Sequence, residues 1–231
     1  MNLKRFSALI LAFLFLFVGC ASTAMVETSG KPAQDAPQNA GQNEKPADPA
    51  NTDNSGTDAG ILVVYFSRTG EQYRVGVIDK GNTAVVAEMI AEENGADMFE
   101  LVPAEDTYPD TYDALTDAAK QEQNEGARPA YRDDVPDLTQ YATVFVGAPV
   151  WWGDWPMILY TFFETEDLSG KTLIPFSTHE GSGLSGFDKK LASACPDSEV
   201  LAGLAVRGED CQTKQDDVRA SVRGWLAGLG Y

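Results

Sequence analysis

The sequence predicts a three-layer, doubly wound α/β fold in residues 61–231, with helices on both faces of a five-stranded parallel sheet. Short apolar runs alternate along this region with segments of helical spacing, the pattern of repeated strand–helix–strand units. The first run, ILVVYF at 61–66, is apolar at every position. Continuous apolar runs of this length are typical of parallel strands covered on both faces.

The remaining elements follow in alternation. We expect strands at residues 61–66, 98–102, 143–147, 171–176 and 200–206. We expect helices at residues 83–93, 110–125, 156–164, 186–194 and 213–229. Pro175 has no N–H to donate to a neighbouring strand, so it should lie near the end of the fourth strand. Sheets of this kind bind ligands at the carboxyl ends of their strands, so the loops after strands one, three and four are the candidate site.

The first 60 residues have a different character. Residues 1–19 are expected to be a secretory signal: Lys4 and Arg5 precede an apolar run at 9–18, which is shorter than the roughly 20 residues that span a bilayer. Small residues before Cys20 resemble a bacterial lipoprotein signal, with the Cys20 thiol lipidated; the alternative is an ordinary signal peptide with a chance cysteine. Residues 20–60 would then be the lipid anchor and a disordered linker, because they contain almost no large apolar residue. The domain would be anchored extracytoplasmically to a bacterial membrane.

The charge of the chain limits the classes of partner that it is expected to bind. The net charge of −18 argues against nucleic acid and favours basic partners or none. Residues 105–137 carry ten acidic against three basic residues and are a candidate docking face for a basic redox partner, or simply a solubilising surface. Cys195 and Cys211 are expected to be either paired or buried as free thiols, and a single histidine in the chain points to no metal site.

The first candidate loop reads SRTGEQYRVGVIDKGNT at 67–83. Its ends look like two halves of one phosphate loop, separated by an excursion at 71–81. Hydroxyl and amide groups of Ser67, Thr69, Asn82 and Thr83 could meet a phosphate together with free N–H groups at the start of the following helix. A polar turn capped by Asn82 or Thr83 is the alternative.

The other two loops offer an aromatic and a polar wall. Residues 147–156 (GAPVWWGDWP) place three tryptophans just past a strand, where at least one should cap the core and another could stack on a flat ring. Residues 177–184 (STHEGSGL) are rich in glycine and serine, so their backbone could approach a ligand closely. His179 in this loop is either a ligand contact or incidental.

The three loops resemble those of the flavodoxins, specifically the branch with a Trp-Trp loop. The resemblance covers residues 61–231 and rests on YFSRTG at 65–70 with GNT at 81–83, APVWWG at 148–153, and PFSTHEGSG at 175–183. Tyr108, Tyr112 and GARP at 126–129 add to it. Flavodoxins typically read Thr-Gly-Asn-Thr without interruption. Residues 71–81 would therefore turn back on themselves, as a short hairpin that leaves one loop.

The resemblance implies a flavodoxin-like strand order of 2-1-3-4-5 and non-covalently bound FMN, with Trp152 or Trp151 stacking on the flavin. The implied cofactor-binding residues are Ser67, Arg68, Thr69, Gly70, Asn82, Thr83, Pro149, Val150, Trp151, Trp152, Gly153, Thr178, His179, Gly181, Ser182 and Gly183. The implied role is electron transfer at the outer face of a bacterial membrane. An FMN-dependent NAD(P)H:quinone-type oxidoreductase and a flavin-free surface binding module remain alternatives.

Overall fold

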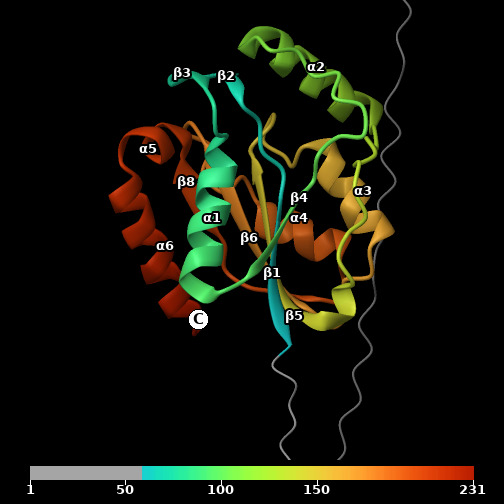
Figure 1. Ribbon diagram of the computed structural model, residues 1–231. Helices are drawn as coiled ribbons and strands as arrows, with labels where there is room; N and C mark the ends of the chain where they lie inside the picture. The colour runs from blue at the N-terminus through green and yellow to red at the C-terminus, as the bar shows by residue number, and fades with distance from the viewer. Residues whose placement is uncertain (1–58) are drawn as a thin grey trace, which may run out of the picture. The chain divides into compact units, whose positions relative to one another are not determined.

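The computed structural model describes residues 59–231 (Figure 1). The predicted signal peptide at 1–19, the lipidation site Cys20 and all but the end of the predicted linker at 20–60 lie outside the described residues. The first strand already begins at Gly60, the last residue assigned to that linker. Within residues 59–231, no helix combines the length and the apolar character that a membrane crossing requires.

The element order agrees with the predicted alternation. The strands are β1 Gly60–Tyr65, β2 Gly70–Gln72, β3 Gly76–Ile78, β4 Asp97–Glu100, β5 Tyr141–Pro149, β6 Thr172–His179, β7 Glu199–Val200 and β8 Leu204–Arg207. The helices are α1 Asn82–Asn94, α2 Tyr112–Glu125, α3 Met157–Thr165, α4 Phe187–Ala194, α5 Gly208–Thr213 and α6 Gln215–Leu229, with a short 3₁₀ turn at Leu138–Gln140.

The main sheet is parallel and has the predicted strand order. Its neighbours run β4-β1-β5-β6-β7, with β8 also pairing with β6, which is the order 2-1-3-4-5 when the strands of this sheet are numbered along the chain. The order reverses between β1 and β5, because β1 pairs with β4 on one side and with β5 on the other. The chain therefore has its topological switch point between the carboxyl ends of β1 and β5.

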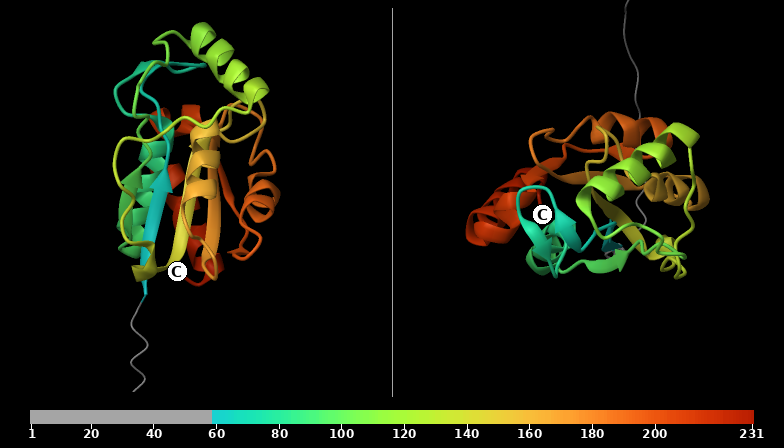
Figure 2. Two further views of the ribbon diagram at one scale, coloured as in Figure 1. Left: turned by 90° about the vertical axis from the view of Figure 1, so that its right-hand side faces the viewer. Right: turned by 90° about the horizontal axis from the view of Figure 1, so that it is seen from above.

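Two apolar cores cover the two faces of the sheet. Successive side chains of a strand point to opposite faces, and β1 accordingly sends Leu62 and Val64 to one core and Val63 and Tyr65 to the other. The first core packs against α3 and α4, and the second against α1 and α6 (Figures 1 and 2). Helix α2 belongs to neither layer: it lies over the upper edge of the sheet, where the carboxyl ends of the strands are (Figure 2).

The prediction that Pro175 lies near a strand end was wrong. Pro175 is the fourth of eight residues in β6 and is buried opposite Val146 of β5. On the other side, β7 pairs with Thr172 and Leu173, and β8 pairs only from Phe176 onward. The missing N–H of the proline therefore falls in the gap between two partner strands, where no ladder requires it.

The same gap explains why the fifth predicted strand is split. Residues 200–206 were predicted as one strand, but the chain leaves the sheet after Val200 and returns at Leu204. At Gly203, a Cβ atom would lie 2.6 Å from the Pro175 carbonyl oxygen, so glycine is what fits there. The helix predicted at 213–229 corresponds to α6 and begins two residues later than predicted, because Lys214 adopts a non-helical conformation between α5 and α6.

The two cysteines are separate free thiols. Cys195 is buried in the core on the α3 and α4 side, and Cys211 in the core on the α1 and α6 side. Burial raises the pKa of the Cys195 thiol to about 11 and that of the Cys211 thiol to about 12. The thiols lie on opposite faces of the sheet, so the pairing alternative does not apply.

Candidate functional site

The first loop is closed although residues 71–81 interrupt it. Strands β2 and β3 pair antiparallel as the predicted short hairpin. Below the hairpin, the Ser67 hydroxyl accepts a hydrogen bond from the Ala84 N–H at 3.1 Å. A Cβ on Gly81 would lie 2.5 Å from the Arg68 carbonyl oxygen and closer still to the Ser67 hydroxyl, so only glycine lets the two ends meet this tightly.

The start of α1 lies at this closed loop. Gly81 is the N-cap residue and has no side chain of its own; the Ser67 hydroxyl accepts from the N–H of Ala84, the third residue of α1. Uncapped N–H groups at a helix start carry partial positive charge and attract anions. Asn82 and Thr83, the first two residues of α1, both line the pocket described below. The local charge therefore suits an anionic group without a lysine or arginine contact.

The three tryptophans of the second loop have three different environments. Trp155 is buried and stacks on Phe187, so it caps the core as predicted for at least one of them. Trp151 is half-buried, edge-on to Phe66 and Tyr108 with ring centroids 5.3 Å apart in each pair. Trp152 is 53% exposed and adopts a left-handed backbone conformation, with φ 51°. Trp152 Nε1–H donates to the Thr116 carbonyl oxygen of α2 at 2.8 Å.

The third loop is joined to the first by a buried hydroxyl pair. The Thr178 and Thr83 hydroxyl oxygens lie 2.8 Å apart, across 95 residues of sequence, with both side chains buried. Beside them, His179 Nδ1 accepts a hydrogen bond from the Gly181 N–H at 2.9 Å, which requires that nitrogen to be unprotonated. Burial, with Arg207 nearby, lowers the pKa of His179, which favours the neutral imidazole that this hydrogen bond requires.

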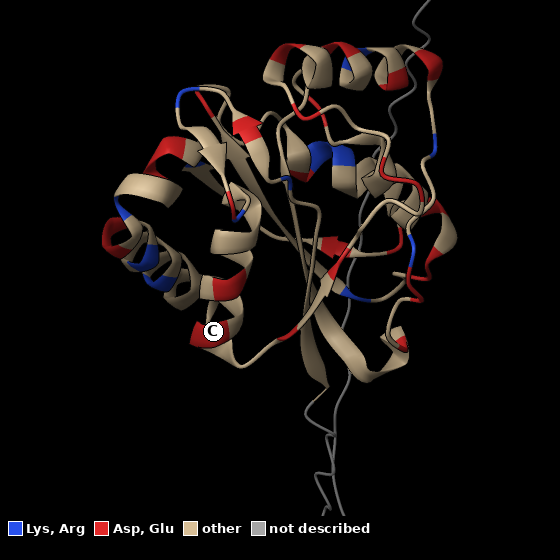
Figure 3. Cartoon of the chain, turned by 45° about the horizontal axis from the view of Figure 1, so that its top comes forward, with Lys and Arg blue, Asp and Glu red and all other residues tan. Residues whose placement is uncertain are grey.

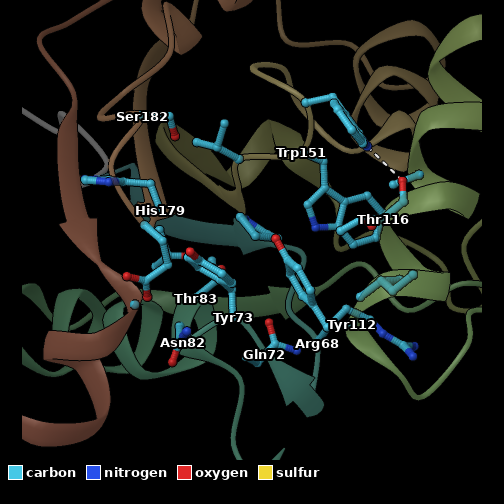
Figure 4. A pocket seen from close by; sticks show the side chains of 18 of the residues that line it. Arg68, Gln72, Tyr73, Asn82, Thr83, Tyr112, Thr116, Trp151, His179 and Ser182 are labelled. Carbon is cyan, nitrogen blue, oxygen red and sulfur yellow. Dashed lines mark hydrogen bonds between the residues drawn. The ribbon is translucent and has the colours of Figure 1, made fainter. Parts of the chain in front are cut away.

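The three loops surround one pocket of about 460 Å³ at the carboxyl ends of β1, β5 and β6 (Figure 4). This volume is within the range of small-molecule sites. Most of the sequence-predicted residues line it: Ser67, Arg68, Asn82, Thr83, Pro149, Val150, Trp151, Trp152, Thr178, His179, Gly181 and Ser182. Residues from three distant parts of the chain are thus brought together where the sequence predicted a site.

Four predicted residues do not line the pocket. Thr69 lies just before the hairpin, where its carbonyl oxygen accepts from Gln72 Nε2 at 3.2 Å, and Gly70 begins β2. Gly153 turns the chain back after Trp152 with φ 73°. The Gly183 carbonyl oxygen is held by the Ser177 hydroxyl at 3.1 Å.

Other residues of the pocket were not predicted. They come mainly from the hairpin and from α2: Gln72, Tyr73, Tyr112, Leu115, Thr116, Ala119, Glu180 and Gly208. Two signals in the sequence pointed this way: an aromatic residue, Tyr73, within the excursion at 71–81, and Tyr112 at a position that resembles the family pattern. Neither signal says that α2 folds over the edge of the sheet, which is a property of the tertiary structure.

The charged residues of the pocket are mostly engaged with protein partners. The Arg68 guanidinium points to Asp106, at 2.6 Å, and lies 5.2 Å from the Tyr108 ring. Glu180 Oε1 accepts from the Glu209 N–H at 2.7 Å, while its other oxygen, Oε2, is buried without a hydrogen bond. Burial raises the pKa of Glu180. Within residues 59–231, no group of three or more metal-ligating side chains is present.

Comparisons with known proteins agree with this architecture. The family model described as Flavodoxin matches residues 60–222. A protein of known structure from Bacteroides eggerthii DSM 20697 is 29% identical, with 74% of this chain and 98% of that chain covered and a TM-score of 0.59. One from Bacteroides uniformis ATCC 8492 is 28% identical, covering 71% and 98% with a TM-score of 0.57. A flavoprotein from Lactobacillus acidophilus NCFM in complex with FMN shares the fold at 21% identity, covering 68% and 99% with a TM-score of 0.50. No curated protein matches the chain significantly.

Proposed function

This chain belongs to the flavodoxin family, and on that premise we propose that it binds FMN without a covalent link and acts in electron transfer. The observation that carries the proposal is the pocket at the switch point between β1 and β5, into which three loops converge. Flavodoxins hold FMN at this place in the sheet. A related structure, the Lactobacillus acidophilus flavoprotein, was solved in complex with FMN.

The phosphate end of FMN fits the start of α1. The N-cap residue Gly81 has no side chain to satisfy the first N–H groups of the helix, and Asn82 and Thr83 at its first turn face the pocket together with Ser67. Backbone N–H groups, hydroxyls and an amide are sufficient donors for a phosphate. Because Arg68 is already paired with Asp106, we assign it no direct charge contact with the phosphate.

The ring end of FMN fits the walls made by the second and third loops. Trp151 and Trp152 supply aromatic surface, while Pro149, Val150 and residues 178–182 supply backbone and small side chains. Trp152 is the more accessible of the two rings and is our candidate for stacking on the flavin. When bound, FMN takes up one or two electrons, and this chain's residues bind it and tune its potential.

We favour an electron carrier over a reductase because of the charge around the site. Acidic residues are spread along α2 and the segments near it (Figure 3), within the region 105–137 that holds ten acidic and three basic residues. Such a surface attracts a basic protein and speeds its docking at low salt.

The carrier role is tested by electron transfer to a basic acceptor. FMN-loaded protein, reduced with one equivalent of dithionite, should pass electrons to cytochrome c, and the rate should fall steeply as NaCl is added. Turnover of NADH or NADPH with menadione should not exceed that of free FMN. Saturable menadione reduction well above the free-FMN rate would contradict the carrier role and support the reductase.

We further propose that the domain works at the outer face of a bacterial membrane, anchored through Cys20. Support comes from the sequence alone: an apolar run at 9–18, small residues before Cys20 and the polar composition of residues 20–60. The full chain expressed in bacteria should incorporate labelled palmitate, and Cys20→Ser should abolish the label. Equal labelling of both chains, or none in either, would contradict lipidation at Cys20.

A further inference from the structure

The hairpin formed by β2 and β3 contributes directly to the pocket. Gln72 and Tyr73 line it, and the Tyr73 ring stacks on the ring of Tyr112 at the start of α2, with centroids 5.5 Å apart and an interplanar angle of 30°. Figure 4 shows the two rings side by side on the pocket wall, with His179 to one side and Trp151 to the other. The residues between the two halves of the phosphate loop therefore reach a different part of the site.

Contacts on both sides fix the position of the hairpin. Toward α2, the Glu71 N–H donates to the Asp110 carbonyl oxygen at 3.3 Å, and the Tyr112 N–H donates to Glu71 Oε2 at 2.9 Å. Toward α5, Arg74 Nε lies 3.7 Å from a carboxylate oxygen of Glu209. The hairpin thus bridges the two elements that flank the pocket mouth, and Tyr73 is held in one place over it.

Helix α2 continues this wall to the second loop. Its residues Leu115, Thr116 and Ala119 line the pocket, and Thr116 accepts the hydrogen bond from Trp152. The Lys120 ammonium lies 5.1 Å from the Trp152 ring centroid, a favourable cation–π arrangement. The hairpin therefore contacts α2, and α2 contacts Trp152, so that the three form one continuous wall of the pocket.

The exposure of Tyr73 is informative. Its side chain is 50% exposed, although it lies on a pocket wall and against another aromatic ring. An aromatic side chain that packs against a neighbouring ring and is only half covered offers a flat apolar surface to a planar ligand. Val77 on the same hairpin is 79% exposed but does not line the pocket, so exposure of the hairpin alone does not account for the position of Tyr73.

We propose that Tyr73 and Tyr112 form an aromatic wall that contacts the flavin ring, so that residues 71–81 build the ring end of the site and do not interrupt its phosphate end. The proposal rests on the proposed FMN binding and names residues outside the three predicted motif loops as determinants of ring affinity. It also assigns a role to the excursion that distinguishes this chain from flavodoxins with an uninterrupted loop.

Paired titrations with FMN and riboflavin test this assignment, because riboflavin has the ring but no phosphate. Tyr73→Ala should weaken the binding of both ligands by the same factor, about tenfold, as expected for the loss of an aromatic contact. Tyr73→Phe should keep both affinities within about twofold, since the ring remains. Val77→Ala is the matched control on the hairpin and should change neither. Thr83→Ala provides the contrast, because it should weaken FMN more than riboflavin.

The outcomes separate this inference from the function on which it rests. If wild-type protein binds both ligands and Tyr73→Ala leaves both affinities unchanged, the aromatic wall is wrong and FMN binding stands. If Tyr73→Ala weakens FMN alone, the hairpin serves the phosphate loop, which also overturns the proposal. If wild-type protein binds neither ligand, the proposed function itself fails. The absorption bands of bound FMN give a second readout: they should shift in Tyr73→Ala and not in Val77→Ala.

Discussion

The Ser67 hydroxyl accepts a hydrogen bond from the Ala84 N–H at 3.1 Å, although the whole β2–β3 hairpin lies between these two residues in the sequence. The end of β1 and the start of α1 are therefore joined as in an uninterrupted loop. The insertion leaves this junction intact because its two ends lie next to each other, with Gly81 in close contact with Ser67 and Arg68.

Gly81→Ala should open this junction. The added Cβ would meet the Arg68 carbonyl oxygen at 2.5 Å, and backbone atoms cannot rotate away as a side chain can. We expect a loss of about 1–3 kcal/mol in the free energy of unfolding, measured in urea, and weaker FMN binding. Gly224→Ala is the control: it lies in α6 with open space around it, so it should stabilise the chain by up to about 1 kcal/mol. Equal effects of the two substitutions would contradict the close approach at Gly81.

The buried hydroxyl pair between Thr83 and Thr178 should show strong coupling. Thr83→Val or Thr178→Val alone leaves the other hydroxyl buried without its partner, which should cost about 1–3 kcal/mol of unfolding free energy. The double variant removes both polar groups, so its loss should be smaller than the sum of the single losses. Additive losses in urea denaturation would show that the two hydroxyls do not depend on each other.

The stability of the third loop should depend on pH through His179. Its pKa is lowered by burial, and its Nδ1 accepts a hydrogen bond that protonation would remove. A lowered pKa in the folded state means that the neutral imidazole stabilises the fold above pH 6.5, the ordinary value, and that this contribution is lost as the pH falls through the lower folded value.

His179→Asn isolates this effect, because the Asn side-chain oxygen can accept from the Gly181 N–H at every pH. The unfolding free energy of the wild type should therefore fall relative to that of the variant as the pH is lowered from 7 to 5. Carboxylates titrate in both chains and cancel in the comparison. A difference that stays constant over this range would contradict the assignment of His179 as a partly buried neutral acceptor.

The hydrogen bond from Trp152 should stabilise the position of α2. The left-handed conformation of Trp152 is uncommon for a bulky residue and directs its indole N–H to Thr116. Trp152→Phe keeps a ring but removes this hydrogen bond, so amide exchange around Thr116 should become about 2–10-fold faster. Trp225→Phe removes a comparable hydrogen bond, from Trp225 Nε1 to the Ala202 carbonyl oxygen, and should leave α2 unaffected. Unchanged exchange in Trp152→Phe would show that other contacts hold α2.

Local pattern predicted the sheet and the loops well. The apolar run at 61–66 and the helical spacing at 83–93 correspond to β1 and α1, because burial on both faces or on one face leaves a clear periodicity. Pro175 was misjudged because the rule against proline in a central strand assumes a continuous partner on each side. Whether that partner is one strand or two is decided by tertiary pairing, which the local sequence does not encode.

The part of the candidate site that lies in the loops after the strands could be predicted from the sequence. The part that is formed by α2 and the hairpin could not. Motifs after β1, β5 and β6 must converge in a parallel sheet of this order, so Asn82, Trp152 and His179 were found. Tyr73 and Tyr112 face the pocket only because the hairpin and α2 fold over it and contact each other. No periodicity in residues 110–125 shows which way that helix leaves the sheet.

The central claim, that this chain binds FMN, is tested most directly by mixing the purified protein with FMN, desalting it and recording the absorption spectrum. Flavin bands should remain with the protein at about one equivalent, and the fluorescence of added FMN should change on binding. If all flavin passes into the small-molecule fraction and FMN keeps its free-solution fluorescence, the pocket does not hold FMN and the account is wrong.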